Sequence, residues 1–137
     1  MYVFVVLISP PNQCLWCDKL LVIFDDIVKE ILKVDPTLKF PEGKPAPIVM
    51  KGQYPKLQKF YQLWKPIILL VPLASWENGS MDHTIIMNSE NGEWKPKWDT
   101  TKPEQFGLWL KEVLGIKTQR DYIELNKCDN VLNLVSR

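Results

Sequence analysis

The alternation of apolar and amphipathic segments predicts an α/β domain. Residues 2–9 form a continuous run rich in valine and aromatic side chains, which is typical of a β-strand covered on both faces. Residues 67–71 form a second run of this kind, bounded by prolines. Two other segments place apolar residues three and four positions apart, which is the spacing of an amphipathic helix. In a chain of 137 residues, such strands and helices indicate a single domain.

The clearest helix is expected to run from Cys17 onward. Apolar side chains recur there at helical spacing, and charged residues occupy much of the remainder. The helix should end near Val34, because Asp35 precedes Pro36 and a residue before proline is biased away from helical dihedral angles.

The next segment, residues 35–55, contains five prolines, so any structure within it must be short. Residues 38–40 and 48–50 are each expected to form a brief strand. Residues 56–64 predict a short helix with its apolar side chains on one side, leading into the second buried strand.

Two more strands are expected at residues 83–88 and 93–98, where His83 would begin the first of them. They flank the turn signal Asn91-Gly92, with a connection longer than a two-residue hairpin loop.

The last helix is expected to begin after an N-cap at Thr101 and to end at Gly115. Residues 1–115 therefore make up the predicted domain. Residues 116–137 mix charged and apolar side chains, and we expect this C-terminal extension to pack on the domain or on a partner protein.

Composition and charge exclude several classes of function. The chain is 46% hydrophobic and 24% charged, and its formal net charge of +1 gives no general attraction to nucleic acid or to an anionic membrane. No apolar stretch approaches the roughly 20 residues needed to cross a bilayer, and the apolar start lacks a basic leader and a cleavage site. Three cysteines suit a reducing compartment. We therefore expect a cytoplasmic protein with no membrane or nucleic-acid partner.

The motif Cys14-Leu15-Trp16-Cys17 lies at the junction of the first strand and the first helix, and Pro66 stands directly before the second buried strand. In these two features the chain resembles the thioredoxin-like superfamily, in which a Cys-x-x-Cys begins the first long helix and a cis-proline precedes a central strand. The resemblance covers about residues 2–114. It implies a thioredoxin-like fold, with a central mixed β-sheet flanked by helices.

The resemblance also implies a thiol-disulfide oxidoreductase that acts on protein thiols and disulfides without a bound cofactor or metal. Cys14 would be the nucleophile, because a helix N-terminus offers unpaired N–H groups and partial positive charge that stabilise a thiolate. Cys17 would resolve the mixed disulfide, and Trp16, Lys65 and Pro66 would contact the substrate. The middle pair of the motif differs from the Gly-Pro of thioredoxins and the Pro-Tyr of glutaredoxins, so no redox direction follows.

A structural role is the alternative for the two cysteines. Free cysteines are often small buried hydrophobes, and a redox-inert or incidentally active thioredoxin-like module would serve as an adaptor. Taken as a whole, the sequence also resembles thioredoxin-like proteins of large DNA viruses. This resemblance implies a virion assembly component, which would contact a structural partner through the C-terminal extension.

Zinc binding and nucleic-acid binding have weaker support in the sequence. A structural zinc site needs four ligands, and only His83 and Cys128 remain, widely separated, so no metal site is expected. Trp94 and Trp98 stand among lysines, as in proteins that stack single-stranded bases. Because alternate residues of a strand share one face, these two rings are expected to cover a neighbouring element instead.

Overall fold

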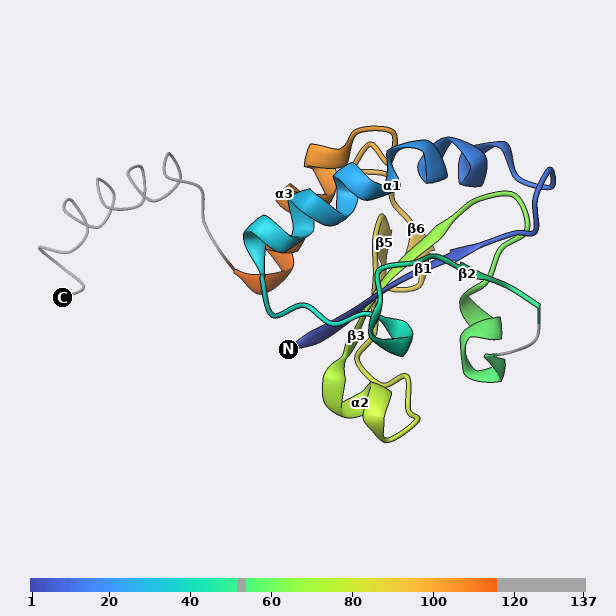
Figure 1. Cartoon of the computed structure of the whole chain (residues 1–137). Coiled ribbons are helices and arrows are strands. Elements are labelled where there is room, and N and C mark those ends of the chain that lie inside the picture. The colour runs from blue at the N-terminus through green and yellow to red at the C-terminus, as the bar shows by residue number, and fades with distance from the viewer. Residues whose placement is uncertain (52–53, 116–137) are drawn as a thin grey trace, which may run out of the picture.

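A four-stranded sheet of order β2-β1-β3-β4 lies at the centre of the computed structural model, which describes residues 1–51 and 54–115 (Figure 1). Strand β1 pairs with β2 in parallel and with β3 antiparallel, and β3 pairs antiparallel with β4. The prediction of a mixed sheet is therefore confirmed. The four strands are β1 (Tyr2–Ile8), β2 (Ile48–Val49), β3 (Ile67–Pro72) and β4 (Ile85–Ile86).

The two central strands are the two apolar runs of the sequence. They pair from Tyr2 to Leu7 of β1, with Val5 opposite Leu69, and both are buried on both faces. Successive side chains of a strand point to opposite faces, so Val3, Val5 and Leu7 enter one core while Phe4, Val6 and Ile8 enter another. This explains why both runs are continuously apolar.

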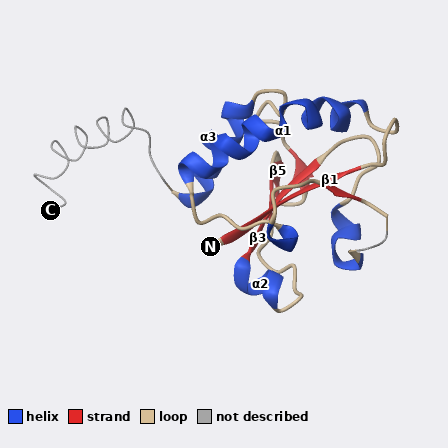
Figure 2. Ribbon diagram, viewed as in Figure 1, coloured by secondary structure: helices blue, strands red, loops and turns tan. Residues whose placement is uncertain are grey.

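Helices α1 (Leu15–Val34) and α3 (Pro103–Leu114) cover one face of the sheet, and the short helix α2 (Leu73–Glu77) lies at the opposite side (Figure 2). The predicted end of the long helix at Val34 is confirmed. Helix α1 buries one stripe of side chains against the sheet and α3, and this stripe consists of Cys17, Leu20, Phe24, Ile27 and Ile31.

The described residues of the proline-rich segment form only short elements, as expected. Residues 48–49 form β2, while the expected strand at residues 38–40 is reduced to a single bridge between Lys39 and Val3. A 3-10 helix, η1 (Pro41–Gly43), lies within the segment, and a second, η2 (Pro55–Phe60), begins at its last residue. The predicted helix at residues 56–64 is thus a shorter 3-10 helix.

The strands predicted at residues 83–88 and 93–98 are wrong in length, because the structure has strands of only two residues there. Strands β5 (Ser89–Glu90) and β6 (Glu93–Trp94) pair directly, so Asn91 and Gly92 form a two-residue connection. Their φ angles of 53° and 79° are both positive, as a type I′ turn requires. His83, which has a φ angle of 61°, lies in a turn before β4 and does not begin a strand.

The N-cap predicted at Thr101 is wrong, whereas the end of α3 at Gly115 is confirmed. Thr101 donates from its backbone N and its Oγ1 to Oδ1 of Asp99, at 2.9 and 2.6 Å. Its hydroxyl therefore bonds within the preceding turn and does not cap α3. These donors hold the pKa of Asp99 below its ordinary value. Lys102 occupies the N-cap position without a side-chain bond, and Gly115 ends the helix at a φ of 73°.

No helix within residues 1–51 and 54–115 is long and apolar enough to cross a membrane. The predicted C-terminal extension, residues 116–137, lies outside the described residues, and so does Cys128.

Candidate redox site

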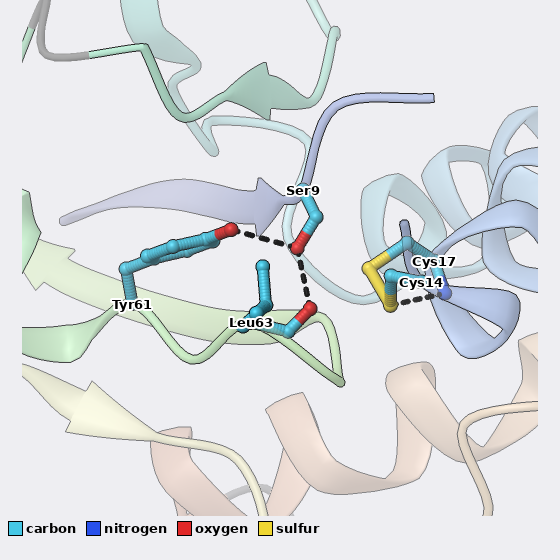
Figure 3. Close-up of a disulfide and its surroundings, with 5 residues drawn as sticks. All are labelled: Ser9, Cys14, Cys17, Tyr61 and Leu63. Atoms are coloured by element: carbon cyan, nitrogen blue, oxygen red, sulfur yellow. Dashed lines mark hydrogen bonds between the residues drawn. A yellow bond between two sulfur atoms is a disulfide. The ribbon is translucent and has the colours of Figure 1, made fainter. Parts of the chain in front are cut away.

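The Cys-x-x-Cys motif lies where the chain leaves β1 and begins α1. Cys14 and Cys17 are joined by a disulfide, with their Cα atoms 5.2 Å apart (Figure 3), a separation within the usual range for this bond. Cys14 is the N-cap of α1, and its Sγ accepts a hydrogen bond from the backbone N of Cys17 at 3.0 Å.

The N-cap position gives Cys14 a specific electrostatic environment. Its extended backbone, with a φ of −149°, precedes the first helical residue, and its sulfur takes one of the N–H groups that a helix N-terminus leaves without a partner. The same N–H group and the partial positive charge of the helix end favour a negative sulfur at this position. The structure thus places Cys14, and not Cys17, at the N-cap of α1.

The sulfurs lie beneath the surface, and the middle of the motif is exposed. Cys14 and Cys17 are 3% and 1% exposed and belong to the core between α1, α3 and the sheet. Leu15 and Trp16 are 63% and 49% exposed. The motif therefore presents an apolar pair to solvent directly beside a buried disulfide.

Ser9, at the end of β1, fixes the segment that leads to Pro66. Its Oγ donates to the carbonyl oxygen of Leu63 at 2.6 Å and lies 2.8 Å from the hydroxyl of Tyr61 (Figure 3). A serine hydroxyl has one proton, so the Tyr61 hydroxyl is the donor of the second bond. Sequence reasoning did not single out Ser9, which only looked like the polar end of an apolar run.

Pro66 occupies the position that the resemblance assigns to a cis-proline, but its peptide bond is trans, as are all the peptide bonds that the structure describes. This is a departure from the superfamily's pattern. It accords with the ordinary preference of X–Pro bonds for the trans form, which is worth about 0.5–1 kcal/mol.

A cleft of about 650 Å³ lies beside the motif. Trp16, Lys65 and Pro66, the three residues predicted to contact a substrate, all line it. Its other walls come from the end of η2 and the loop after it, from the start of β3, from the β4 region and from the β5-β6 hairpin. The structure therefore brings the three residues together, although neither cysteine lines the cleft.

Lys65 and Trp94 connect two walls of this cleft. The Nζ atom of Lys65 lies 3.5 Å from the centroid of the Trp94 ring, a cation–π contact between the segment before Pro66 and strand β6. Trp94 is 53% exposed, whereas Trp98 packs against the core of α1 and α3. The expectation that the two rings share one strand face is wrong, because β6 ends at Trp94.

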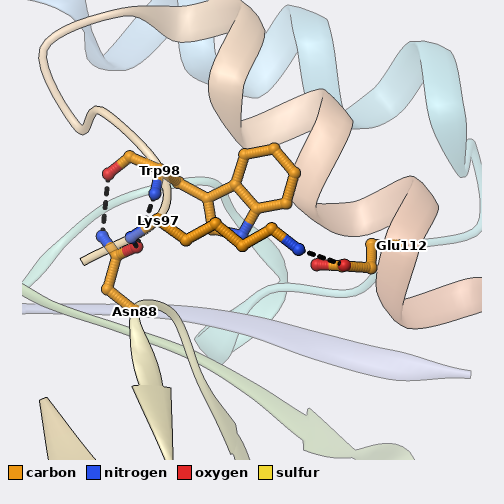
Figure 4. Close-up of polar contacts among 4 residues, drawn as sticks. All are labelled: Asn88, Lys97, Trp98 and Glu112. Carbon is orange, nitrogen blue, oxygen red and sulfur yellow. Dashed lines mark hydrogen bonds and ion pairs between the residues drawn. The ribbon is translucent and has the colours of Figure 1, made fainter. Parts of the chain in front are cut away.

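Asn88 holds the chain that follows the hairpin, and sequence reasoning missed it. Its Oδ1 accepts hydrogen bonds from the backbone N of Lys97 and Trp98 at 2.8 and 2.7 Å, and its Nδ2 donates to the carbonyl of Trp98 at 2.9 Å (Figure 4). Lys97 also forms an ion pair with Glu112 of α3. Asn88 is 6% exposed and has a φ of 61°, which asparagine tolerates better than most residues. In the sequence, this tolerance was the only property that could have pointed to Asn88.

Within the described part of the chain, no group of three or more His, Cys, Asp or Glu residues is placed to hold a metal ion. Comparisons with protein-family models, with curated proteins and with solved structures find no match to this chain. The description of the fold and of the site therefore rests on the structure alone. The structure is an α/β domain with a disulfide-linked Cys-x-x-Cys at the start of its first helix, which is compatible with the thioredoxin-like superfamily.

Proposed function

We propose that the protein is a thiol-disulfide oxidoreductase of thioredoxin-like fold that exchanges disulfides with protein substrates through Cys14 and Cys17. The observation that supports this most directly is the disulfide at the start of α1, with Cys14 as the N-cap. Trp16, Lys65 and Pro66 are proposed as substrate contacts, because they line the cleft beside the motif.

The exchange begins with the reduced protein. The Cys14 thiolate attacks one sulfur of a substrate disulfide, and the other substrate sulfur leaves as a thiolate that takes up a proton. Cys17 then gives up its proton and attacks the Cys14 sulfur, so that the second substrate sulfur leaves. Two electrons pass from the protein dithiol to the substrate, and the protein finishes in the disulfide form.

Replacing each cysteine separately tests this proposal. Cys17→Ser should accumulate a mixed disulfide between Cys14 and a substrate protein, because attack proceeds and release does not. Cys14→Ser should capture no substrate. Non-reducing gels of both variants measure capture, and iodoacetamide rates against pH measure the reactivity of Cys14. Equal capture by both variants, or a Cys14 rate that rises only near the free-thiol pKa of about 8.5, would contradict catalysis.

The burial of both sulfurs supports a second candidate, a structural disulfide in an adaptor or assembly protein. The sulfur of a cysteine that is 3% exposed or less resists attack by an external thiol unless the chain around it moves. Under this second proposal the protein is an assembly component, for example of a virion. Under the first, it acts in the cytoplasm.

Reduction of the native protein separates the two candidates. In the first, dithiothreitol reduces the disulfide of the folded protein, and both thiols become alkylated without denaturant. In the second, alkylation requires urea.

A further inference from the structure

The cleft beside the motif carries charge of one sign. Lys59 and Lys65 both line it, and no Asp or Glu is among the described residues of its walls. The chain as a whole has a formal net charge of only +1. The described walls of the cleft are therefore positively charged, whereas the chain as a whole is nearly neutral.

Aromatic rings hold both ammonium groups at the cleft. Lys65 Nζ lies 3.5 Å from the Trp94 ring centroid, and Lys59 Nζ lies 5.1 Å from that of Phe60. Both rings, together with Trp16, line the same cleft. A cleft with low-dielectric walls and charges of one sign focuses the electric field and raises the local concentration of an oppositely charged ligand.

The acidic residues of the adjacent hairpin do not cancel this charge. The Glu90 carboxylate pairs with Lys95 at 3.4 Å. Glu93 precedes Trp94 in β6, and neighbouring side chains of a strand point to opposite faces. Because Trp94 lines the cleft, Glu93 points away from it.

We infer that this cleft selects an extended acidic segment of a partner protein, in which the reactive cysteine is flanked by Asp or Glu and by an aromatic residue. The inference rests on the proposed oxidoreductase function and names its substrate class. The carboxylates pair with Lys59 and Lys65, and the aromatic residue packs against Trp16 and Trp64. Trp16 precedes Cys17 directly, so a chain bound in the cleft contacts the residue next to the disulfide.

Matched peptides test the inference. Each peptide carries one central cysteine next to phenylalanine, held as a mixed disulfide with a chromogenic thiol, and the flanking positions are Glu, Gln or Lys. The reduced protein becomes the Cys14–Cys17 disulfide as it converts the mixed disulfide into two thiols. At low ionic strength the Glu peptide should react about tenfold faster than the Lys peptide, the lower end of the range for field-focusing clefts. In 0.5 M NaCl the difference should shrink, because salt screens exposed charges.

Two double variants provide the matched control. Lys59→Glu with Lys65→Glu should reverse the order of the Glu and Lys peptides. Lys29→Glu with Lys44→Glu makes the same change in net charge at positions outside this cleft, and it should preserve the order. Circular dichroism checks the fold of both variants, and the salt dependence of the unaltered protein provides a test that needs no variant.

The outcomes distinguish this inference from the function on which it rests. Equal rates for the three peptides, or the same reversal in both double variants, would overturn the inference while leaving the oxidoreductase function intact. If the reduced protein reacts neither with any peptide nor with an oxidised small dithiol, the oxidoreductase function fails, and the inference fails with it.

Discussion

The hydroxyl of Ser9 joins the end of β1 to residues that lie 52 and 54 positions later in the chain. Ser9 is 3% exposed, so its polar atom requires partners within the protein. Both partners belong to the loop that supplies a wall of the cleft. At the scale of single residues, one buried hydroxyl therefore sets the position of the segment before Pro66.

Replacing Ser9 by alanine should lower the free energy of unfolding by about 1–2 kcal/mol, because the Leu63 carbonyl and the Tyr61 hydroxyl both lose a partner. Tyr61→Phe should cost less, about 0.5–1 kcal/mol, since Ser9 still donates to Leu63. Urea unfolding of the two variants and of the double variant measures this. The double variant should cost less than the sum of the two single changes, and strict additivity would contradict the arrangement of Figure 3.

Asn88 combines a positive φ with three side-chain hydrogen bonds, and two replacements separate these contributions. Asn88→Ala should lower the free energy of unfolding by about 2–4 kcal/mol, because it leaves two backbone N–H groups without acceptors and strains the backbone. Asn88→Gly loses the same bonds but tolerates the φ, so it should be less destabilising than alanine by about 1 kcal/mol. Urea midpoints measure both changes. Equal midpoints for the two variants would show that backbone strain plays no part.

Some residues of the candidate site stand in local sequence patterns and others do not, for a physical reason. Cys14, Cys17, Trp16, Lys65 and Pro66 stand in a local motif or directly before a strand, and short-range patterns predict such positions. Ser9 and Asn88 act through partners that only the folded chain brings close, and their residue types are common in loops. No local pattern distinguishes a serine that meets Tyr61 from one that meets water.

At the scale of elements, one glycine within α3 and one directly after it are present for different reasons. Gly107 faces α1, where an added Cβ would lie 3.5 Å from the Glu30 carbonyl oxygen and 3.7 Å from a methyl group of Val34. These are ordinary contact distances, so alanine fits. Gly115 ends the helix at a φ of 73°, with nothing within 4 Å of an added Cβ. Its requirement is therefore conformational and not steric.

The same substitution at the two positions should have opposite effects. Gly107→Ala should raise the free energy of unfolding by about 0.5–1 kcal/mol, because alanine has the higher helix propensity. Gly115→Ala should lower it by about 1 kcal/mol, because a left-handed φ is costly for alanine. Thermal unfolding of both variants provides the comparison. Destabilisation by Gly107→Ala would mean that the two helices lie closer together than the structure shows.

Long elements were predictable because they repeat one signal many times. The end of α1 was also predictable, since Pro36 marks it locally. The elements from residue 73 to residue 100 were not, because each strand there contains only two residues and α2 contains five. Asn91-Gly92 identified the turn, but no local pattern showed that the Asn88 side chain would accept hydrogen bonds from the backbone of Lys97 and Trp98.

At the scale of the whole molecule, β1 and β3 separate two cores, and the disulfide belongs to the one beneath α1 and α3. Both cores are large and apolar, so we expect the fold to form without a covalent link. Only two residues lie between Cys14 and Cys17, and a loop this short removes little entropy from the unfolded chain.

Reduction should therefore lower the free energy of unfolding by no more than about 2 kcal/mol. Urea unfolding with and without dithiothreitol, together with a Cys14→Ser, Cys17→Ser double variant, measures this difference. A loss above about 5 kcal/mol, which exceeds what loop closure provides, would show that the disulfide is a principal stabiliser. Such a result would favour the structural candidate over the oxidoreductase.

The residues around the disulfide also determine when the two cysteines become buried during synthesis of the chain. The core around Cys14 includes Ile68 and Leu70 of β3 as well as Phe106 and Leu110 of α3. At about 5–20 residues per second, a ribosome adds the roughly 95 residues between Cys14 and the end of this set in about 5–20 s. Throughout that interval both sulfurs belong to a chain that lacks the residues that bury them. Until Phe106 and Leu110 of α3 can pack on this core, the two cysteines are therefore more open to oxidants and thiols than in the folded protein, where they are 3% and 1% exposed.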